Sequence, residues 1–445
     1  MILFAPSTRS FSTARSQRGA ATLAVSLILL VCMTLVAFSV NKSMLFEQKT
    51  SANQMRSTKA FEAAEAGIEW ATSMLNDVRY INAICTTATT GTNPQSFRSK
   101  YLPYGAGSGF TPISTAQPGC SIGTATSGTP AVTIPVLSCS CPAAGVNPSL
   151  ASSTNPTFTV KFDPINATTL PGVNTNKESV LVTSYGCTAA DGRCVPGAAG
   201  SADAYQKISV ILKLRPALKA VPAAAISTGG SLVLGSSAST VGNTDAASNG
   251  TLVNAGGTCC GSQNFRSTMT LPGSPVENAI VTGDTSLSAL SSSQDAMFKA
   301  FFGTTVAQYQ ADPATKVLTA TMCGGDCASA FQTAFDQGYR AFYLQGDMSI
   351  SNGTIGTQAN PVILATSADL KFNGGTQVWG LIYADTAVSW NPNGLGSGGL
   401  NGALVTRGSF SPNANANYLY DADALSKIRG LTGTMMRVPG SWKDF

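Results

Sequence analysis

The residues with the clearest chemistry in this chain are its cysteines. There are 11 among 445 residues, and all but Cys32 lie in polar, glycine-rich sequence. An even number of such cysteines indicates disulfides formed in an oxidising compartment. The spacing leaves most of the pairing open. The expected local bridges are Cys187 with Cys194 and Cys323 with Cys327. The adjacent Cys259 and Cys260 are expected to pair with other cysteines rather than with each other.

Other reactive groups are few. The chain has no histidine, which excludes Ser-His-Asp and Cys-His catalysis and every histidine-ligated metal site. Asp347, Asp369 and Asp385 recur at the corners of a sequence repeat, where carboxylates could act as acid and base on a polysaccharide or bind calcium. Aspartate is also a common turn residue, so we expect structural roles for these three. Asp421 and Asp423 could hold Ca²⁺, but they do not form an EF-hand loop, and we expect no cofactor and no enzymatic activity.

Four aromatic residues in the same half of the chain allow two interpretations. They could form a glycan-binding face, or they could pack in the core, which we expect for at least half of them. These residues are Trp379, Tyr383, Trp390 and Tyr418.

The charge of the chain is low and unevenly placed. Charged residues make up 11% of the sequence, hydrophobic residues 43%, and the formal net charge is +5. Arg9, Arg15 and Arg18 lie in the first 19 residues, which contain no acid; without them 24 basic residues face 22 acidic ones. No clustered basic face remains, so nucleic-acid binding is set aside.

A membrane anchor follows this basic segment. Residues 20–40 carry no charge and are long enough to span about 30 Å of hydrocarbon. Because basic residues precede the apolar run, the N-terminus is expected in the cytoplasm and the body of the protein outside the inner membrane. The sequence after Val40 is a poor signal-peptidase site, whereas Gly19 directly before the apolar run suits cleavage that retains the helix.

The helix is predicted to continue beyond the membrane to about Asp77. No proline interrupts residues 20–79, and apolar residues recur at spacings of three and four, which predicts one buried stripe. A membrane anchor followed by a separate short helix is the alternative. The residues of the stripe are Phe61, Ala64, Ile68, Ala71 and Leu75.

The N-terminal segment resembles type IV pilus minor pilins of the PilX family, most specifically in the sequence AFEAAEAGIEWA at residues 60–71. The resemblance implies that a prepilin peptidase removes residues 1–19, so that Gly19 ends the leader and Ala20 begins the mature chain. Major pilins usually carry a glutamate at the fifth mature position, where this chain has Ala24. A buried charge in the bilayer is costly unless it is paired, so its absence is compatible with a place at the pilus tip.

The rest of the chain is predicted to be mostly β, giving an α+β fold. Alternating segments at 158–162, 179–183 and 208–214 predict an antiparallel pilin-like sheet packed on the long helix, within a domain at 80–215. Residues 80–155 are expected to contain loops held by disulfides. A Pro/Ala linker at 216–225 precedes a β-rich C-terminal domain at 226–445.

A weak repeat marks this C-terminal domain. The apolar positions Met348, Leu370, Val388 and Phe410 are 22, 18 and 22 residues apart. Spacing near 20 with turn residues at each corner predicts a short β-solenoid, with an irregular β-sandwich as the alternative. Short helices are expected at 287–309 and 328–337, and a terminal capping helix at 419–428.

These features favour a minor pilin that helps to prime assembly and to form the tip of a pilus used in adhesion and twitching motility. The resemblance implies as partners other minor and major pilins, a tip adhesin, the prepilin peptidase and the inner-membrane assembly platform. A tip pseudopilin of a type II secretion system is the nearest alternative. A membrane-anchored β-solenoid hydrolase acting on polysaccharide is the alternative from another class.

Overall fold

The computed structural model divides the chain into two compact units, residues 1–58 and 59–445. The residues that the structure describes are 18–88, 95–105, 107–127, 132–150, 155–170, 174–198, 200–234, 239–261, 265–386, 388–391, 398–411 and 416–444. Most of the expected leader therefore lies outside the described residues.

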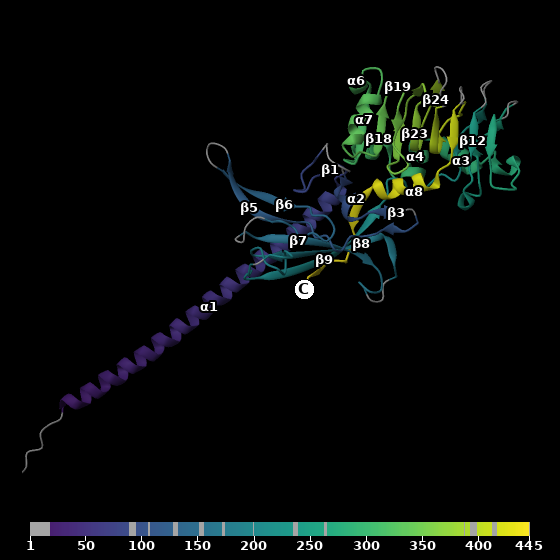
Figure 1. Cartoon of the computed structure of the whole chain (residues 1–445). Coiled ribbons are helices and arrows are strands. Elements are labelled where there is room, and N and C mark those ends of the chain that lie inside the picture. Colours follow the sequence, from purple (N-terminus) through teal and green to yellow (C-terminus); the bar gives the residue numbers. More distant parts are fainter. Residues whose placement is uncertain are drawn as a thin grey trace, which may run out of the picture. The chain divides into compact units, whose positions relative to one another are not determined.

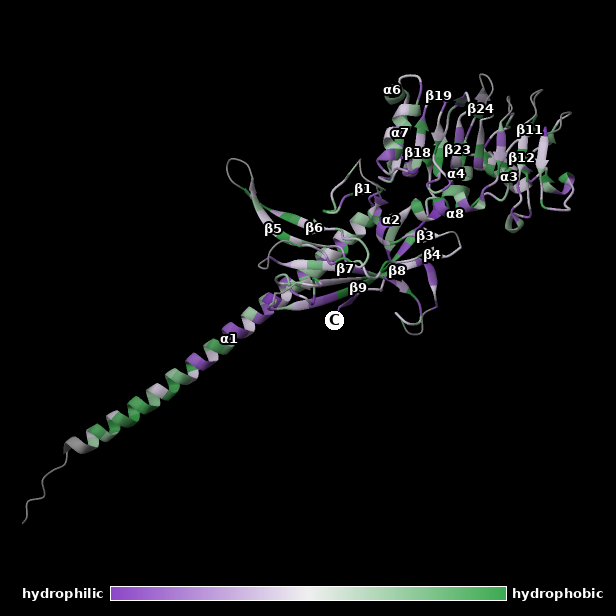
Figure 2. Ribbon diagram, in the orientation of Figure 1, coloured by the Kyte–Doolittle hydropathy of each residue, from purple (hydrophilic) through white to green (hydrophobic). Residues whose placement is uncertain are grey.

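One continuous helix, α1 (Arg18–Asn76), confirms the predicted long N-terminal helix. Among the described residues, it is the helix with the length and composition needed to cross a membrane. Its apolar side chains in the first unit are exposed, for example Leu23 at 67% and Phe38 at 71%. Figure 2 shows these apolar residues gathered along the N-terminal part of α1.

The predicted antiparallel sheet is present and packs on the C-terminal part of α1. Alternate residues of three central strands face the helix, among them Phe158, Val182 and Val210. The strands of this sheet lie in the order β27-β9-β8-β7-β5-β6, and β28 also pairs with β9. Their bounds are β5 Gly119–Ser127, β6 Val132–Ser140, β7 Thr157–Ile165, β8 Asn176–Cys187, β9 Tyr205–Arg215, β27 Thr434–Arg437 and β28 Lys443–Asp444.

The region expected to hold only disulfide-tied loops contains a regular hairpin. Strands β5 and β6 pair over nine residues, and β7 pairs with β5 only at residues 119–121. The hairpin shows little alternation of apolar and polar residues in the sequence. The reason is that both of its faces are largely exposed where it extends past the end of its pairing with β7. The same region holds the short elements β1 Tyr80–Ile81, β2 Gln95–Ser96, α2 Phe97–Tyr101, β3 Tyr104–Gly105 and β4 Gly109–Phe110.

The end of the chain corrects the expected domain boundary at 226–445. Strand β27 pairs antiparallel with β9, with Met435 opposite Leu214, and β28 places Lys443 opposite Ser209. The C-terminus therefore lies beside β9 (Figure 1). The β-rich domain is an insertion between two neighbouring strands of the sheet, because its last strands complete that sheet rather than the domain itself.

The inserted domain is a parallel β-solenoid (Figure 1). In the order of pairing, its main sheet runs β17-β18-β21-β23-β25-β10-β13-β16, a second sheet runs β19-β22-β24, and β11 pairs with β14. The strands before the helices are β10 Ile226–Thr228, β11 Leu232–Val233, β12 Thr240–Gly242, β13 Val253–Ala255, β14 Cys259–Cys260, β15 Ser267–Met269 and β16 Ile280–Val281, with short 3₁₀ helices at Ala246–Ser248 and Val276–Ala279. The strands after them are β17 Thr315–Thr319, β18 Ala341–Gln345, β19 Met348–Ser351, β20 Thr354–Ile355, β21 Val362–Thr366, β22 Leu370–Asn373, β23 Gln377–Ala384, β24 Val388–Asn391, β25 Gly399–Thr406 and β26 Asn417–Leu419.

The register confirms the sequence repeat. Met348 pairs with Leu370 and Leu370 with Val388, as the spacing predicts. Phe410 is bridged to Leu232 of the next coil. All strand pairings among the described residues of this domain are parallel, which is incompatible with the antiparallel hairpins of an irregular sandwich. At the bend of β25, Gly402 has φ +146°, and a Cβ there would lie 1.7 Å from the carbonyl oxygen of Gly380.

The stack is built from two separate stretches of chain. Ile226 of β10 pairs with Leu404 of β25, and Val241 of β12 pairs with Tyr418 of β26. The first coils in the sequence thus lie beyond the last coil in space. The expected linker at 216–225 is packed rather than free, since Leu218 is fully buried and the backbone N–H of Lys219 donates to the carbonyl of Phe301.

Helices cover one face and one end of the solenoid. The expected helical regions correspond to α3 Thr285–Ser291, α4 Gln294–Phe302, α5 Val306–Ala311, α7 Ala328–Asp336 and α8 Ala422–Leu431, whereas α6 Ala320–Cys323 was not expected. Helix α8 does not cap the end of the stack as expected. Leu425 and Ile428 pack with Leu381 and Ala403 on the sheet face, because the chain must cross this face to return to β9.

The contact between α1 and β8 gives a first prediction. A Cβ added at Gly186 would lie 2.2 Å from the carbonyl oxygen of Ala60 and 2.3 Å from the backbone nitrogen of Ala64. We expect Gly186→Ala to lower the free energy of unfolding by about 1–3 kcal/mol, because overpacking forces backbone shifts. Chemical denaturation of the full chain in detergent measures this. Gly375→Ala is the control, since a Cβ there meets nothing within 4 Å, and equal losses in both variants would contradict the prediction.

Candidate assembly site

The predicted apolar stripe of α1 is the contact between the helix and the sheet. Ala64, Ile68, Ala71 and Leu75 are fully buried, and Phe61 is half-buried against the same cluster. This face is thus occupied within the subunit. The surface that α1 offers for other contacts is the exposed apolar part N-terminal to Lys59.

The C-terminal end of α1 is joined to the returning strand by one side chain. The amide nitrogen of Asn76 donates to the carbonyl of Met435 at 3.1 Å, and the backbone N–H of Met435 donates to the side-chain oxygen of Asn76 at 2.7 Å. The side-chain amide of Asn76 therefore forms with Met435 of β27 the two hydrogen bonds that a neighbouring backbone amide would form. An ion pair between Arg437 and Glu69, with 2.5 Å between Nη2 and Oε1, adds a second link between the same elements.

A buried arginine completes this junction. Arg98 of α2 donates from Nε to the carbonyl of Leu75 at 2.8 Å and from Nη2 to the carbonyl of Gly433 at 2.9 Å. The first of these satisfies an unpaired carbonyl at the helix end, where a positive charge is also favourable. Burial lowers the pKa of the Arg98 guanidinium to about 10, so it remains charged at neutral pH. Arg98 and Asn76 together hold α1, α2 and the returning chain at one point.

The structure joins ten cysteines in five disulfides. Both expected local bridges are present, and the expectation for Cys259 and Cys260 is wrong because these neighbours are bonded to each other. The tight turn after β14, with Cys260 at φ +81°, brings the two side chains together. The bonded pairs are Cys85–Cys141, Cys120–Cys139, Cys187–Cys194, Cys259–Cys260 and Cys323–Cys327.

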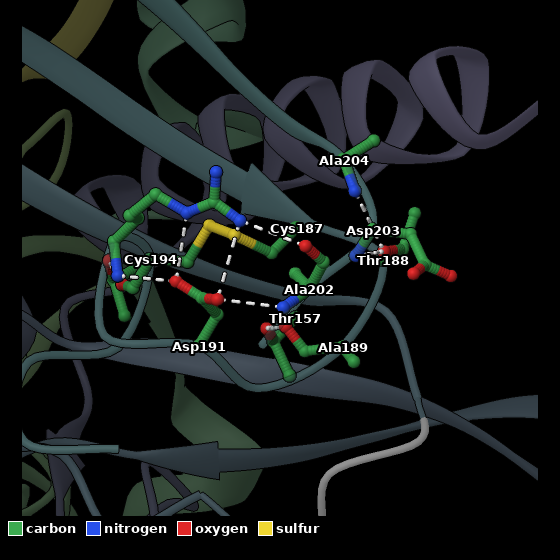
Figure 3. Close-up of a disulfide and its surroundings, with 11 residues drawn as sticks. Thr157, Cys187, Thr188, Ala189, Asp191, Cys194, Ala202, Asp203 and Ala204 are labelled. Atoms are coloured by element: carbon green, nitrogen blue, oxygen red, sulfur yellow. Dashed lines mark hydrogen bonds and ion pairs between the residues drawn. A yellow bond between two sulfur atoms is a disulfide. The ribbon is translucent and has the colours of Figure 1, made fainter. Parts of the chain in front are cut away.

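The Cys187–Cys194 loop encloses a carboxylate (Figure 3). Asp191 accepts from Arg193 Nε at 3.0 Å and from the backbone N–H of Ala202 at 2.7 Å. These hydrogen bonds lower the pKa of Asp191 to about 2, and the bond from the Arg193 side chain contributes most. The hydroxyl of Thr159 in β7 donates to the carbonyl of Cys194. The loop is thereby fixed on the sheet face opposite α1.

Two of the three carboxylates considered for catalysis, those of Asp385 and Asp347, are engaged in contacts within the fold. Asp385 is buried and accepts from Arg407 Nε and from the hydroxyl of Tyr383, both at 3.1 Å, and from Gln294. Asp347 accepts from the backbone N–H of Asp369 at 3.0 Å, which links two coils. Asp421 caps the N-terminus of α8. Within the described part of the chain, no group of three or more Cys, Asp or Glu residues is arranged to hold a metal ion.

The aromatic residues do not form an exposed face. Tyr383, Trp390 and Tyr418 are each 1% exposed, and Trp390 stacks on Phe372 with ring centroids 4.3 Å apart. Trp379 alone among the four is half-buried. Core packing therefore accounts for the other three.

Sequence reasoning missed the residues of the junction. Asn76 carried a signal as a helix-terminating residue, but nothing local identified Met435 as its partner, 359 residues away. Arg98 carried no signal, because a lone arginine in a polar segment is usually exposed.

Comparison with known proteins bears on the N-terminal segment. Residues 18–69 match the family model described as PilX N-terminal. No curated protein sequence matches the chain. Among solved structures, the chain is similar to the competence-associated pilin ComZ from Thermus thermophilus, at 12% identity over 88% of this chain and 97% of that chain, with a TM-score of 0.24. A TM-score this low carries no argument about this chain.

The helix and sheet described above define a protein with one long N-terminal apolar helix and a disulfide-bonded α+β body. Its N-terminal segment, residues 18–69, matches the PilX N-terminal family model. The match ends at residue 69, so the solenoid lies outside it.

The junction yields a second prediction. We expect Asn76→Ala to lower the free energy of unfolding by about 1–3 kcal/mol, because the backbone N–H and the carbonyl of Met435 would both lose their partner. Denaturation of the full chain in detergent is the measurement. Asn53→Ala is the matched control, since Asn53 lies on the same helix and is exposed. A control that loses as much as Asn76→Ala would refute the role of the junction.

The enclosed carboxylate yields a prediction about pH. The pKa of Asp191 is lower in the folded chain than its ordinary value of 3.8, so its contacts stabilise the fold above about pH 4 and are lost as pH falls toward 2. We expect the stability difference between the wild type and Asp191→Asn to be largest at pH 5–7 and to shrink below pH 4. Denaturation of both proteins across this range tests it, and a difference that does not change with pH would count against it.

Proposed function

We propose that this protein is a minor pilin of a type IV pilus that helps to prime assembly and takes a place at the pilus tip. The observation that carries the proposal is the PilX-type helix, whose apolar surface before Lys59 is exposed and available to the helices of other pilins. The mature chain would begin at Ala20, after a prepilin peptidase has cut behind Gly19. Before assembly it would lie in the inner membrane with its N-terminus in the cytoplasm and its body in the periplasm.

Two features support a tip position rather than the filament shaft. Ala24 stands where a shaft subunit would present an acid to its neighbour, so this chain lacks one docking contact. The solenoid insertion is also large, and repeating it along a closely packed shaft would crowd neighbouring subunits. Because the insertion enters after β9 and leaves before β27, it is attached to the pilin-like sheet at two points. This supports its use as a rigidly held module for a partner or a surface.

The partners that follow from the proposal are major and other minor pilins, the inner-membrane assembly platform and a tip adhesin. The proposed function includes no catalytic role and no cofactor. Asp385, the most buried of the candidate carboxylates, is already occupied by Arg407, Tyr383 and Gln294.

Processing at Gly19 tests the proposal. We expect mass spectrometry of the wild-type chain from piliated cells to give a methylated Ala20 at the N-terminus. We expect Gly19→Leu to retain the leader and to be absent from sheared pili, because the uncut basic segment cannot leave the cytoplasmic side. Ser16→Ala, which leaves the junction unchanged, is the control. Normal processing and piliation with Gly19→Leu, or co-purification of the wild type with secretion-system components instead of pili, would overturn the proposal.

A further inference from the structure

Three sulfur atoms meet at the end of the solenoid that carries β19. The Sδ atom of Met348 lies 3.1 Å from the Sγ atom of Cys327 and 3.8 Å from the Sγ atom of Cys323. Met348 is the first residue of β19, and its side chain is 6% exposed. The thioether therefore contacts both sulfur atoms of the 323–327 disulfide from the side of the core.

Hydrogen bonds hold the cysteine loop on β19 independently of the disulfide. The backbone N–H of Cys327 donates to the carbonyl of Ser349 at 2.9 Å, and the hydroxyl of Ser349 donates to the carbonyl of Gly325 at 2.7 Å. The carboxylate of Asp326 accepts from the N–H of Ser351 at 3.3 Å. Because none of these bonds uses a cysteine sulfur, the two cysteines stay beside the thioether when the bond between them is opened.

The disulfide can be reached from outside the fold. Cys323 is half-buried and Cys327 is buried, and the two glycines that follow Cys323, Gly324 and Gly325, are exposed. An attacking thiol therefore reaches the sulfur of Cys323 first and expels that of Cys327. Cys327 is the N-cap residue of α7, where the helix N-terminus stabilises a thiolate. A more stable leaving thiolate is expelled faster, so this disulfide is suited to exchange with an external dithiol.

The three sulfur atoms form a set of soft ligands. Thiolates and thioethers favour soft ions such as Cu(I). A structural zinc site needs four ligands, and the carboxylate in this loop, that of Asp326, already accepts from the N–H groups of Ala328 and Ser351. The chain has no histidine to complete a zinc site. The set therefore fits a three-coordinate Cu(I) ion.

The spacing of the sulfur atoms also suits one ion. Three sulfur ligands at roughly 2.3 Å from a metal, the length of a zinc–thiolate bond, lie about 4 Å from one another. The Sδ atom of Met348 is already 3.8 Å from one cysteine sulfur and 3.1 Å from the other. Opening the disulfide allows the two cysteine sulfurs to move apart to the same spacing. Small side-chain shifts therefore convert the closed disulfide into a site with three ligands.

We propose that Cys323, Cys327 and Met348 bind one Cu(I) ion when an external dithiol opens the 323–327 disulfide. A thiolate of the dithiol attacks Cys323 and releases Cys327, and the second thiol of the dithiol then displaces Cys323. The dithiol is oxidised to a disulfide, and its two electrons and two protons pass to the two cysteines. Each cysteine releases its proton on binding Cu(I), and the thioether completes the site. This inference is independent of the proposed pilus role.

Peptide mapping after alkylation tests the site. The full chain in detergent is treated with dithiothreitol without denaturant, freed of it, and given one Cu(I) per chain before iodoacetamide is added. We expect Cu(I) to protect Cys323 and Cys327 from alkylation. Cys259 and Cys260, a half-buried pair with no methionine sulfur among its described contacts, are expected to stay reactive. A 323–327 bond that dithiothreitol does not open, or equal labelling of the two pairs with Cu(I) present, would overturn the proposal.

Removal of the thioether tests the third ligand. Met348→Leu keeps an apolar side chain of similar volume, so the fold is retained. We expect its affinity for Cu(I), measured after reduction by competition with bicinchoninate, to fall roughly 10–100-fold, since loss of even an outer partner of a metal site has that effect. Met322→Leu is the matched control, because Met322 is next to Cys323 in the chain but 52% exposed, and we expect it to keep the wild-type affinity. Wild-type affinity in Met348→Leu, or an equal loss in both variants, would refute the site.

Discussion

The pairing of β27 with β9 is the interaction on which the rest of the structure depends. It closes the sheet after an excursion of more than 200 residues and makes the solenoid an insertion instead of a tail. Asn76 and Arg98 hold the same strand to the end of α1, so helix, sheet and solenoid meet at one buried point. Buried amide and guanidinium groups are costly when unpaired, and this cost favours the one arrangement in which Met435 and Gly433 supply their partners.

The coils of the solenoid are covered from several sides. Its middle coils are buried on both sides by neighbours in register, and its flank is covered by α3, α4, α5 and α8. At the end that carries β19, the 323–327 disulfide loop bonds the strand edge and α7 packs on the core.

The PilX N-terminal match and the solenoid occupy separate parts of the chain. The matched segment is residues 18–69, and the apolar side chains in its first part are exposed. Within the solenoid, the carboxylates of Asp385, Asp347 and Asp421 are engaged in contacts of the fold.

The sequence by itself determined what depends on local patterns. The unbroken apolar helix, the buried stripe from Ala64 to Leu75, the three central strands and the spacing of Met348, Leu370 and Val388 could all be predicted, because each repeats with the period of its own element. Only the tertiary structure decided the return of residues 434–444 to β9, the stacking of β10 on β25, the bond between Cys259 and Cys260, and the place of α8. These features join short strands and single side chains across long stretches of chain, where no local period exists and the packing of the whole domain selects the partner.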